Sequence, residues 1–251
     1  TAEVLLARAR AALDNNEPAR ARGYAADLLA DDPWEWRALW MDGLASTAQE
    51  DWSTAMASFN AVCQQVPGEL APKLALAVAC ERGGRPEVAE GLYDTCAQTD
   101  ATYVAPASFG MARVRAMRGD AQGAVAALDQ VPSSSRGFVE SRQVRADVLL
   151  TAGNANDLAV LDEAMRSIES VSMDPTTKRR YTVRILQQAL AVVLAGGAAS
   201  KAKVGSLEAT EAGLRQGLES TFRNLARDAS QLDERIELVN QANAVRSWTL
   251  T

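Results

Sequence analysis

A 34-residue period constrains the fold of this chain more than any other feature of its sequence. Ala21, Ala55 and Ala89 follow one another at intervals of 34 residues, and Pro33 and Pro67 are separated by the same interval. Between these positions, apolar residues recur at the spacing of about 3.6 residues that is typical of amphipathic helices. A unit of this length cannot bury its own apolar face, so it is stable only against neighbouring copies. The sequence therefore predicts a stack of helical hairpins.

The segment from Trp34 to Leu76 shows the repeat most clearly, as two amphipathic helices joined by a polar turn and followed by the start of a third. Within it, Gly43, Ala55, Phe59 and Pro67 are separated by 12, 4 and 8 residues. This spacing resembles that of the small, aromatic and proline positions of a tetratricopeptide repeat. The small residues allow close helix packing, the aromatic ring fills the gap between hairpins, and the proline closes the second helix. The scaffold residues expected on this basis are Ala21, Pro33, Gly43, Ala55, Phe59, Pro67, Ala89, Tyr93 and Ala124.

The repeat predicts four hairpins in residues 1–132. Pro18 and Pro86 each follow a turn and stand at the start of a new helix, where proline is well tolerated. With one inserted residue, the register continues to Ala124. The expected hairpins are Ala2–Asp32, Trp34–Val66, Glu69–Thr99 and Val104–Val131.

Residues 133–251 keep the helical period but lose the repeat spacing, which indicates divergent hairpins. Asp174 and Pro175 are expected to cap and begin one helix, and Ser230 is expected to cap the last helix, with Asp233 in its first turn. A loop of about ten residues is expected after Gly196–Gly197. The expected helices are Ser135–Thr151, Asn156–Val171, Pro175–Leu194, Leu207–Asp228 and Gln231–Val245.

Together these patterns predict an all-α protein, a right-handed superhelical solenoid of tetratricopeptide hairpins with about thirteen helices. Residues 1–132 and 133–251 are expected to form one continuous solenoid. A helix left over after six hairpins would cap the stack with a polar outer face. Because the chain starts without Met, directly on a helical pattern, we expect it to be a fragment of a longer protein.

The composition excludes several classes of function. The chain of 251 residues is 47% hydrophobic, which argues against disorder, and its net charge of −6 argues against binding to nucleic acid or anionic membranes. The absence of histidine removes Ser-His-Asp and Cys-His nucleophile systems and most zinc sites. We therefore expect no catalytic residue, cofactor or metal, and no membrane-inserted segment. Cys63, Cys80 and Cys96 are expected to be reduced, buried side chains of a cytoplasmic protein.

Aromatic and arginine side chains on the first helix of each hairpin suggest a protein-binding surface. At the positions that line the concave side of a tetratricopeptide superhelix, they could anchor a helix or peptide of a partner. The alternative is that the tryptophans belong to the core between repeats. Because Trp34 and Trp36 point in different directions, at least one tryptophan of the cluster Trp34, Trp36, Trp40 and Trp52 is expected at the surface. The partner-binding candidates are Arg10, Arg37, Trp40, Leu44, Leu74, Val78, Phe109 and Arg113.

Two other charged features have simpler interpretations. A groove that binds the carboxylate of a peptide C-terminus would need Lys and Asn at the concave positions, which here hold mainly Leu, Val, Trp and Arg. The basic run Lys178–Arg180 is expected to be a solvated helix face, with docking of an acidic partner as the alternative.

Three stretches of the sequence are more specific than the general repeat. They are PWEWRALW at residues 33–40, PGELAPKLALA at 67–77 and SFGMARVRAMRGD at 108–120, and the tail at 213–246 adds a fourth. Together they resemble the C-terminal tetratricopeptide region of actinobacterial serine/threonine protein kinase G. The sequence itself contains no glycine-rich loop, catalytic loop or metal-binding loop of a kinase.

The resemblance implies a parent protein with a rubredoxin-like segment and a kinase domain. It also implies three protein partners: a forkhead-associated-domain regulator of 2-oxoglutarate dehydrogenase as substrate, a membrane-bound amino-acid sensor, and the kinase domain in cis. This would link the domain to glutamate metabolism and could recruit it to the inner face of the membrane. We expect a regulatory interaction domain. The alternatives are a structural homodimerisation or bracing domain and, much less favoured, an enzyme.

Overall fold

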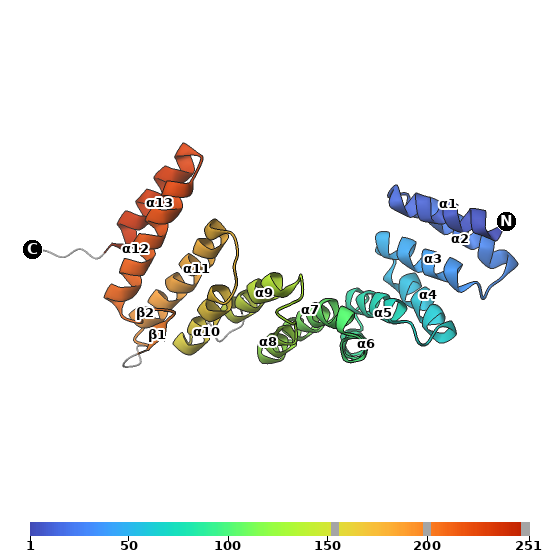
Figure 1. Ribbon diagram of the computed structural model, residues 1–251, viewed down its shortest axis with the longest axis horizontal. Helices are drawn as coiled ribbons and strands as arrows, with labels where there is room; N and C mark the ends of the chain where they lie inside the picture. The colour runs from blue at the N-terminus through green and yellow to red at the C-terminus, as the bar shows by residue number, and fades with distance from the viewer. Residues whose placement is uncertain (152–155, 198–201, 247–251) are drawn as a thin grey trace, which may run out of the picture. The chain divides into compact units, whose positions relative to one another are not determined.

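The computed structural model describes residues 1–151, 156–197 and 202–246, which contain thirteen α-helices and a two-stranded β-hairpin. The helices form two compact units, Thr1–Arg118 and Gly119–Thr251 (Figure 1). The predicted all-α fold class and number of helices are confirmed. The boundary between the units falls between the two helices of the fourth predicted hairpin. A single continuous solenoid stays a prediction.

In the first unit, each helix packs against the next in the chain, and α1 also contacts α3 while α5 contacts α7. This is the arrangement of stacked hairpins, in which the first helices of successive repeats are neighbours. The helices of this unit are α1 (Ala2–Asp14), α2 (Pro18–Asp31), α3 (Trp36–Ala48), α4 (Trp52–Gln65), α5 (Leu70–Arg82), α6 (Pro86–Thr99) and α7 (Ala101–Met117).

A residue with positive φ closes the turn inside each predicted hairpin. Asn16 and Glu50 both have φ of 58°, Gly84 has 77° and Gly119 has 79°. These positions are 34, 34 and 35 residues apart, so the turn conformation repeats with the sequence period and includes its one inserted residue. Asparagine and glycine adopt this left-handed conformation readily, whereas glutamate does so with strain.

Two glycines allow aromatic rings to enter the space between helices. A Cβ atom added at Gly43 of α3 would lie 2.5 Å from Cε1 of Phe59 in α4, and one added at Gly110 of α7 would lie 2.3 Å from Cζ of Tyr93 in α6. Both rings are almost completely buried. Of the other scaffold residues, Ala21, Ala55, Ala89 and Ala124 are fully buried, whereas Pro33 and Pro67 are exposed at the turns between hairpins.

Helix α7 starts at Ala101, three residues before the predicted start at Val104. The side chain of Asp100 accepts a hydrogen bond from the backbone N–H of Thr102 at 2.7 Å and thereby caps the helix. Pro106 lies inside α7. It stands in the second turn of the helix, where its ring removes one backbone hydrogen bond without ending the helix.

The second unit packs its helices around leucine, isoleucine and valine side chains from α9 to α12, including Leu161, Ile185, Leu214 and Leu218. Its helices are α8 (Ala121–Asp129), α9 (Phe138–Thr151), α10 (Leu158–Glu169), α11 (Pro175–Leu194), α12 (Glu211–Asp228) and α13 (Leu232–Val245). The bounds of α11 are those predicted, and Asp174 caps it by accepting from Thr177 N at 2.8 Å.

A short antiparallel hairpin replaces part of the loop predicted after Gly196–Gly197, of which residues 198–201 lie outside the described chain. Strand β1 (Lys203–Val204) pairs with β2 (Leu207–Glu208), and Gly205 turns the chain with φ of 60°. Val204 is buried against the core of the unit. Leu207 therefore lies in a strand, and α12 begins at Glu211 instead of Leu207, after a cap by Thr210.

Helix α13 begins at Leu232 with Gln231 in the cap position, where no side chain makes a capping hydrogen bond. The predicted cap by Ser230 is therefore wrong, although Asp233 does lie in the first turn. All three cysteines are free, with Cys80 and Cys96 buried and Cys63 partly buried. Burial raises the pKa of each thiol.

The repeating turn predicts opposite effects for two glycine-to-alanine changes. Gly84→Ala places a side chain at positive φ and should destabilise the first unit by about 1 kcal/mol. Gly91→Ala, in the exposed interior of α6, should stabilise it by about 0.5–1 kcal/mol. Neither added Cβ meets an atom within 4 Å, so packing does not confuse the comparison. Urea denaturation measures the free energy of unfolding of both variants. A change of the same sign in both would contradict the assigned turn.

The aromatic–glycine contact predicts that Gly43→Ala destabilises the protein by about 1–3 kcal/mol, because the new methyl group overlaps the Phe59 ring. Gly23→Ala is the matched control, since its added Cβ meets nothing within 4 Å. Combining Gly43→Ala with Phe59→Leu should be less destabilising than the sum of the two single changes. Additive free energies of unfolding in this double-mutant cycle would show that the two side chains do not compete for the same space.

Candidate protein-interaction surface

The eight partner-binding candidates lie on the first helices of the four predicted hairpins, all within the first unit. None of the eight is fully buried. We call this set the first-helix surface. It comprises Arg10 of α1, Arg37, Trp40 and Leu44 of α3, Leu74 and Val78 of α5, and Phe109 and Arg113 of α7.

The apolar members of the first-helix surface are half-buried. Leu74 and Val78 are four residues apart and share one side of α5, as do Trp40 and Leu44 on α3. The Trp40 ring packs against the Phe59 ring with centroids 5.3 Å apart and planes inclined by 55°. Trp40 is thus part of the packing layer beneath the surface as well as part of the surface.

Arg10 and Arg37 are already paired with carboxylates of the chain. Arg10 Nε lies 3.2 Å from Asp14 Oδ1 in an exposed pair. Arg37 donates from Nε to Glu35 Oε1 at 2.9 Å and from Nη1 to Glu3 Oε1 at 2.7 Å, which joins α3 to α1. The hydrogen bond from Arg37 lowers the pKa of Glu35. Both arginines therefore have carboxylate partners within the chain, and neither presents an unpaired charge to a ligand.

Arg113 holds a buried carboxylate between α5 and α7. It donates from Nε and Nη2 to the two oxygens of Glu81, at 2.7 and 2.9 Å, and Tyr93 donates its hydroxyl to Glu81 Oε2 at 2.6 Å. The Glu81 side chain is 4% exposed and that of Arg113 is 46% exposed. Burial raises the pKa of Glu81, but the hydrogen bonds from Arg113 and Tyr93 outweigh it, and the pKa lies below its usual range. Arg113 is therefore a structural residue.

Glu81 is not among the residues predicted from the sequence. Its position in the sequence could have indicated this role. Glu81 comes three residues after Val78, on the side of α5 that carries the candidates, and 32 residues before Arg113. A carboxylate and a guanidinium separated by nearly one repeat can meet across neighbouring first helices.

The tryptophan cluster is divided between surface and packing. Trp34 is 71% exposed and Trp36 is 42% exposed, which confirms that at least one tryptophan lies at the surface. Trp52 is half-buried, and its Cβ would lie 3.2 Å from a Cβ added at Gly83, so it packs against the end of α5. Trp34 is the most exposed of the four and lies outside the first-helix surface.

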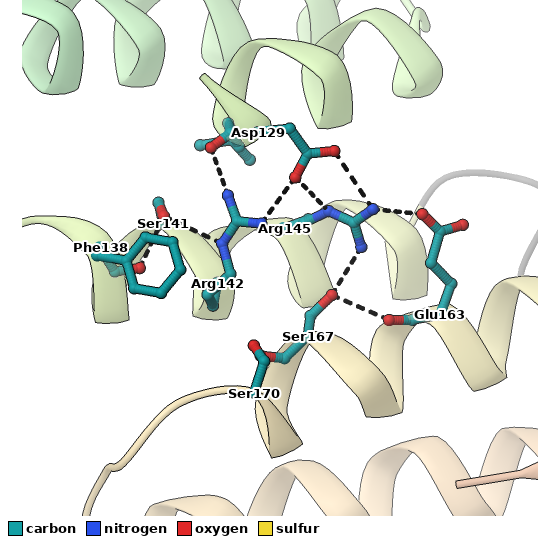
Figure 2. A network of polar contacts seen from close by, with 9 residues as sticks. Asp129, Phe138, Ser141, Arg142, Arg145, Glu163, Ser167 and Ser170 are labelled. Carbon is teal, nitrogen blue, oxygen red and sulfur yellow. Dashed lines mark hydrogen bonds and ion pairs between the residues drawn. The ribbon is translucent and has the colours of Figure 1, made fainter. Parts of the chain in front are cut away.

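A polar network in the second unit links three helices (Figure 2). Arg142 and Arg145 of α9 both donate to Asp129 of α8, at 2.7 and 3.0 Å, and Arg145 also donates to Ser167 of α10 at 2.7 Å and forms an ion pair with Glu163. Both guanidinium-bearing side chains are largely buried. Since carboxylates compensate both cations, the network stabilises the packing of α8, α9 and α10.

Two hollows adjoin this network. One of about 320 Å³ has an apolar floor that includes Val125, Leu149 and Val160, and the other of about 280 Å³ lies beside Arg166 and Ser170. In the second hollow, the Glu163 carboxylate and the Ser167 hydroxyl are both bound to Arg145. In the described part of the chain, no group of three or more acidic or cysteine side chains could hold a metal ion. No helix among those described is long and apolar enough to cross a bilayer.

Comparison with known proteins agrees with the repeat structure. The family model described as protein kinase G tetratricopeptide repeat matches residues 1–249. Serine/threonine-protein kinase PknG of Mycolicibacterium smegmatis is 34% identical over 246 residues, and that of Mycobacterium leprae is 35% identical over 247 residues. Each alignment covers 97% of this chain but 32% of the relative.

Solved structures support the fold alone. A tetratricopeptide repeat protein from Parabacteroides merdae superposes with a TM-score of 0.55 at 14% identity, covering 96% of this chain and 84% of that one. The type IV pilus biogenesis factor PilW also has a TM-score of 0.55, at 17% identity, covering 95% of this chain and 98% of its own.

The buried carboxylate predicts a pH-dependent effect of Arg113→Met. At neutral pH this change should destabilise the protein by about 1–3 kcal/mol, because it leaves the Glu81 charge without its main partner. The folded-state pKa of Glu81 is lowered, so its stabilisation is present above the unfolded-state pKa and is lost as the pH falls. The difference between wild type and Arg113→Met should therefore shrink as the pH falls below the usual pKa of a glutamate side chain, about 4.3.

Urea denaturation at several pH values measures this difference. Arg10→Met, which removes an exposed pair, is the control and should change stability by less than about 0.5 kcal/mol. A constant difference between wild type and Arg113→Met across the pH range would show that Glu81 is not the group involved.

Proposed function

The chain belongs to the protein kinase G tetratricopeptide-repeat family, and from this membership we propose that it is the regulatory interaction domain of a larger serine/threonine protein kinase. The chain spans 32% of the length of the mycobacterial kinases that it matches. Kinase activity of the whole protein, its substrates and its partners are therefore parts of this proposal.

The half-buried apolar centre of the first-helix surface is the observation that carries the proposal. Leu44, Leu74 and Val78 are neither buried in the core nor fully exposed, and they come from two different repeats. Such a surface suits an apolar helix or peptide of a partner. The ion pair of Arg37 joins α3 to α1, and that of Arg113 joins α7 to α5, so each helix that carries these apolar residues is held to another first helix.

Binding would regulate phosphorylation by bringing proteins together. A partner held on this domain would meet the linked kinase domain at a high effective concentration, without any new contact at the site of phosphoryl transfer. The family relation supports three partners: a forkhead-associated-domain regulator that links the kinase to glutamate and 2-oxoglutarate metabolism, a membrane-bound amino-acid sensor, and the kinase domain in cis. Such a protein would work in the cytoplasm, at times at the inner face of the membrane.

The exposed tryptophans favour one alternative. Trp34 and Trp36 precede and begin α3, and Val4 of α1 is 48% exposed, so large apolar side chains are available near the start of the unit. These side chains could brace the kinase domain or form a homodimer. Sedimentation of the protein as a strict monomer at high micromolar concentration would contradict the homodimer.

The proposal predicts that Leu44→Ser combined with Val78→Ser weakens binding of the forkhead-associated-domain regulator to the full-length protein by at least about tenfold, or 1.4 kcal/mol. Val88→Ser, which removes an exposed apolar side chain from α6, is the matched control and should leave the affinity unchanged. Calorimetry gives the affinities, and circular dichroism verifies folding. Equal affinity of the wild type and the double variant would move the binding site away from the first-helix surface.

A further inference from the structure

The last helix exposes an apolar stripe. Leu232, Ile236 and Val239 of α13 are 67%, 50% and 36% exposed, and their spacing of four and three residues places them on one side of the helix. A polar outer surface was expected for this capping helix, and α13 does not fully provide it. In a helical stack, a stripe of this kind is normally covered by another helix.

A groove between α12 and α13 adjoins the stripe. It has a volume of about 430 Å³ and is lined by Arg223, Ala226 and Arg227 of α12 and by Arg235 and Val239 of α13. Val239 belongs to both the groove and the stripe, so the two form a continuous surface. We call this surface the α12–α13 groove.

The positive charge of the groove is only partly compensated, and two carboxylates that adjoin its arginines in the sequence pair with α11 instead. Arg179 of α11 forms an ion pair with Asp228, and Arg180 pairs with Glu234 at 2.8 Å. Asp228 and Glu234 are the chain neighbours of Arg227 and Arg235. The basic run of α11, expected to be a solvated face, thus binds two carboxylates within its own unit.

The three arginines of the groove differ in their partners. Arg223 keeps an ion pair with Glu219 at 2.9 Å. Arg235 donates to the carbonyl oxygen of Ala229 at 2.9 Å, a partner without a formal charge. Arg227 is exposed and has no ion pair with any described residue. Two of the three arginines that line the groove therefore have no carboxylate partner among the described residues, in a chain whose net charge is −6.

We propose that the α12–α13 groove binds an acidic amphipathic helix of a partner protein. Leucine or isoleucine side chains of that helix would cover Ile236, Val239 and Leu232, and its carboxylates would pair with Arg227 and Arg235. Apolar contact supplies the buried area, and charge-assisted hydrogen bonds fix the orientation of the helix. This surface lies in the second unit and is separate from the first-helix surface.

Charge also argues against a second copy of the chain as the occupant. In a two-fold symmetric contact the same patch meets itself, so the uncompensated arginines of both copies would lie close together. Like charges at an interface oppose association. An acidic partner turns the same arginines into favourable contacts.

The experiment uses two synthetic helical peptides with identical leucine positions, one carrying glutamate and the other lysine at the flanking positions. Fluorescence anisotropy measures their binding to the whole protein at low and high salt. We expect the acidic peptide to bind at least about tenfold more tightly than the basic one at low salt, and added salt to reduce this preference. Photo-crosslinking with mass spectrometry should place the acidic peptide on α12 and α13.

Charge reversal provides the variant test. Arg227→Glu combined with Arg235→Glu should reverse the preference, so that the basic peptide binds more tightly. Ile236→Asp should weaken binding of the acidic peptide. Arg8→Glu, at an exposed position in the first unit, is the control for a change in net charge and should alter neither affinity. Gain of binding by the basic peptide cannot result from unfolding, which circular dichroism checks separately.

Three results would overturn the proposal: equal binding of both peptides to wild type, an unchanged preference after charge reversal, or crosslinks outside α12 and α13. Self-association that Ile236→Asp abolishes would assign the groove to a second copy and would also overturn it. Leu44→Ser with Val78→Ser should not affect peptide binding here. Failure of this proposal is therefore distinguishable from failure of the proposed regulatory function.

Discussion

The close approach of helices at glycine is the constraint on which the first unit depends. A hairpin of two helices has more apolar surface than it can bury alone, and an aromatic ring placed between helices covers much of it. Phe59 and Tyr93 fit because Gly43 and Gly110 have no side chains where the rings lie. These contacts hold α3 against α4 and α7 against α6, so the core and the candidate surface are built from the same helices. Trp40, which packs on Phe59, belongs to both.

Much of the fold could be predicted because spacing, turn residues and helix length are independent signals. Pro175–Leu194 was predicted to the residue, since a capping aspartate and a proline mark its start. Features that depend on contacts distant in sequence could not be predicted. Leu207 has a helical pattern, but the turn at Gly205 and the burial of Val204 place it in a strand. Similarly, nothing local to Glu81 shows that Arg113 and Tyr93 will stabilise its buried charge.

Arginine has two different roles in this protein. Arg37, Arg113 and Arg145 each join helices by binding carboxylates of the chain. The α12–α13 groove is different because Arg227 and Arg235 form no ion pair with a described residue, while Asp228 and Glu234 pair with α11. A list of charged residues cannot distinguish these cases, since each arginine looks alike in the sequence. Only the three-dimensional structure shows which arginines are paired with carboxylates of the chain and which remain able to bind a partner.

The one-residue insertion before Gly119 shows how length variation can be absorbed by this architecture. A residue added within a helix rotates everything after it by about 100°. In α7, a longer helix is combined with a shorter junction before it. It has 17 residues where α5 has 13, whereas Asp100 alone separates it from α6 in place of the four residues 66–69 before α5. Four residues gained by the helix and three lost from the junction leave a net gain of one. The junctions between hairpins are thus the places where the chain can change length while every helix keeps its buried face.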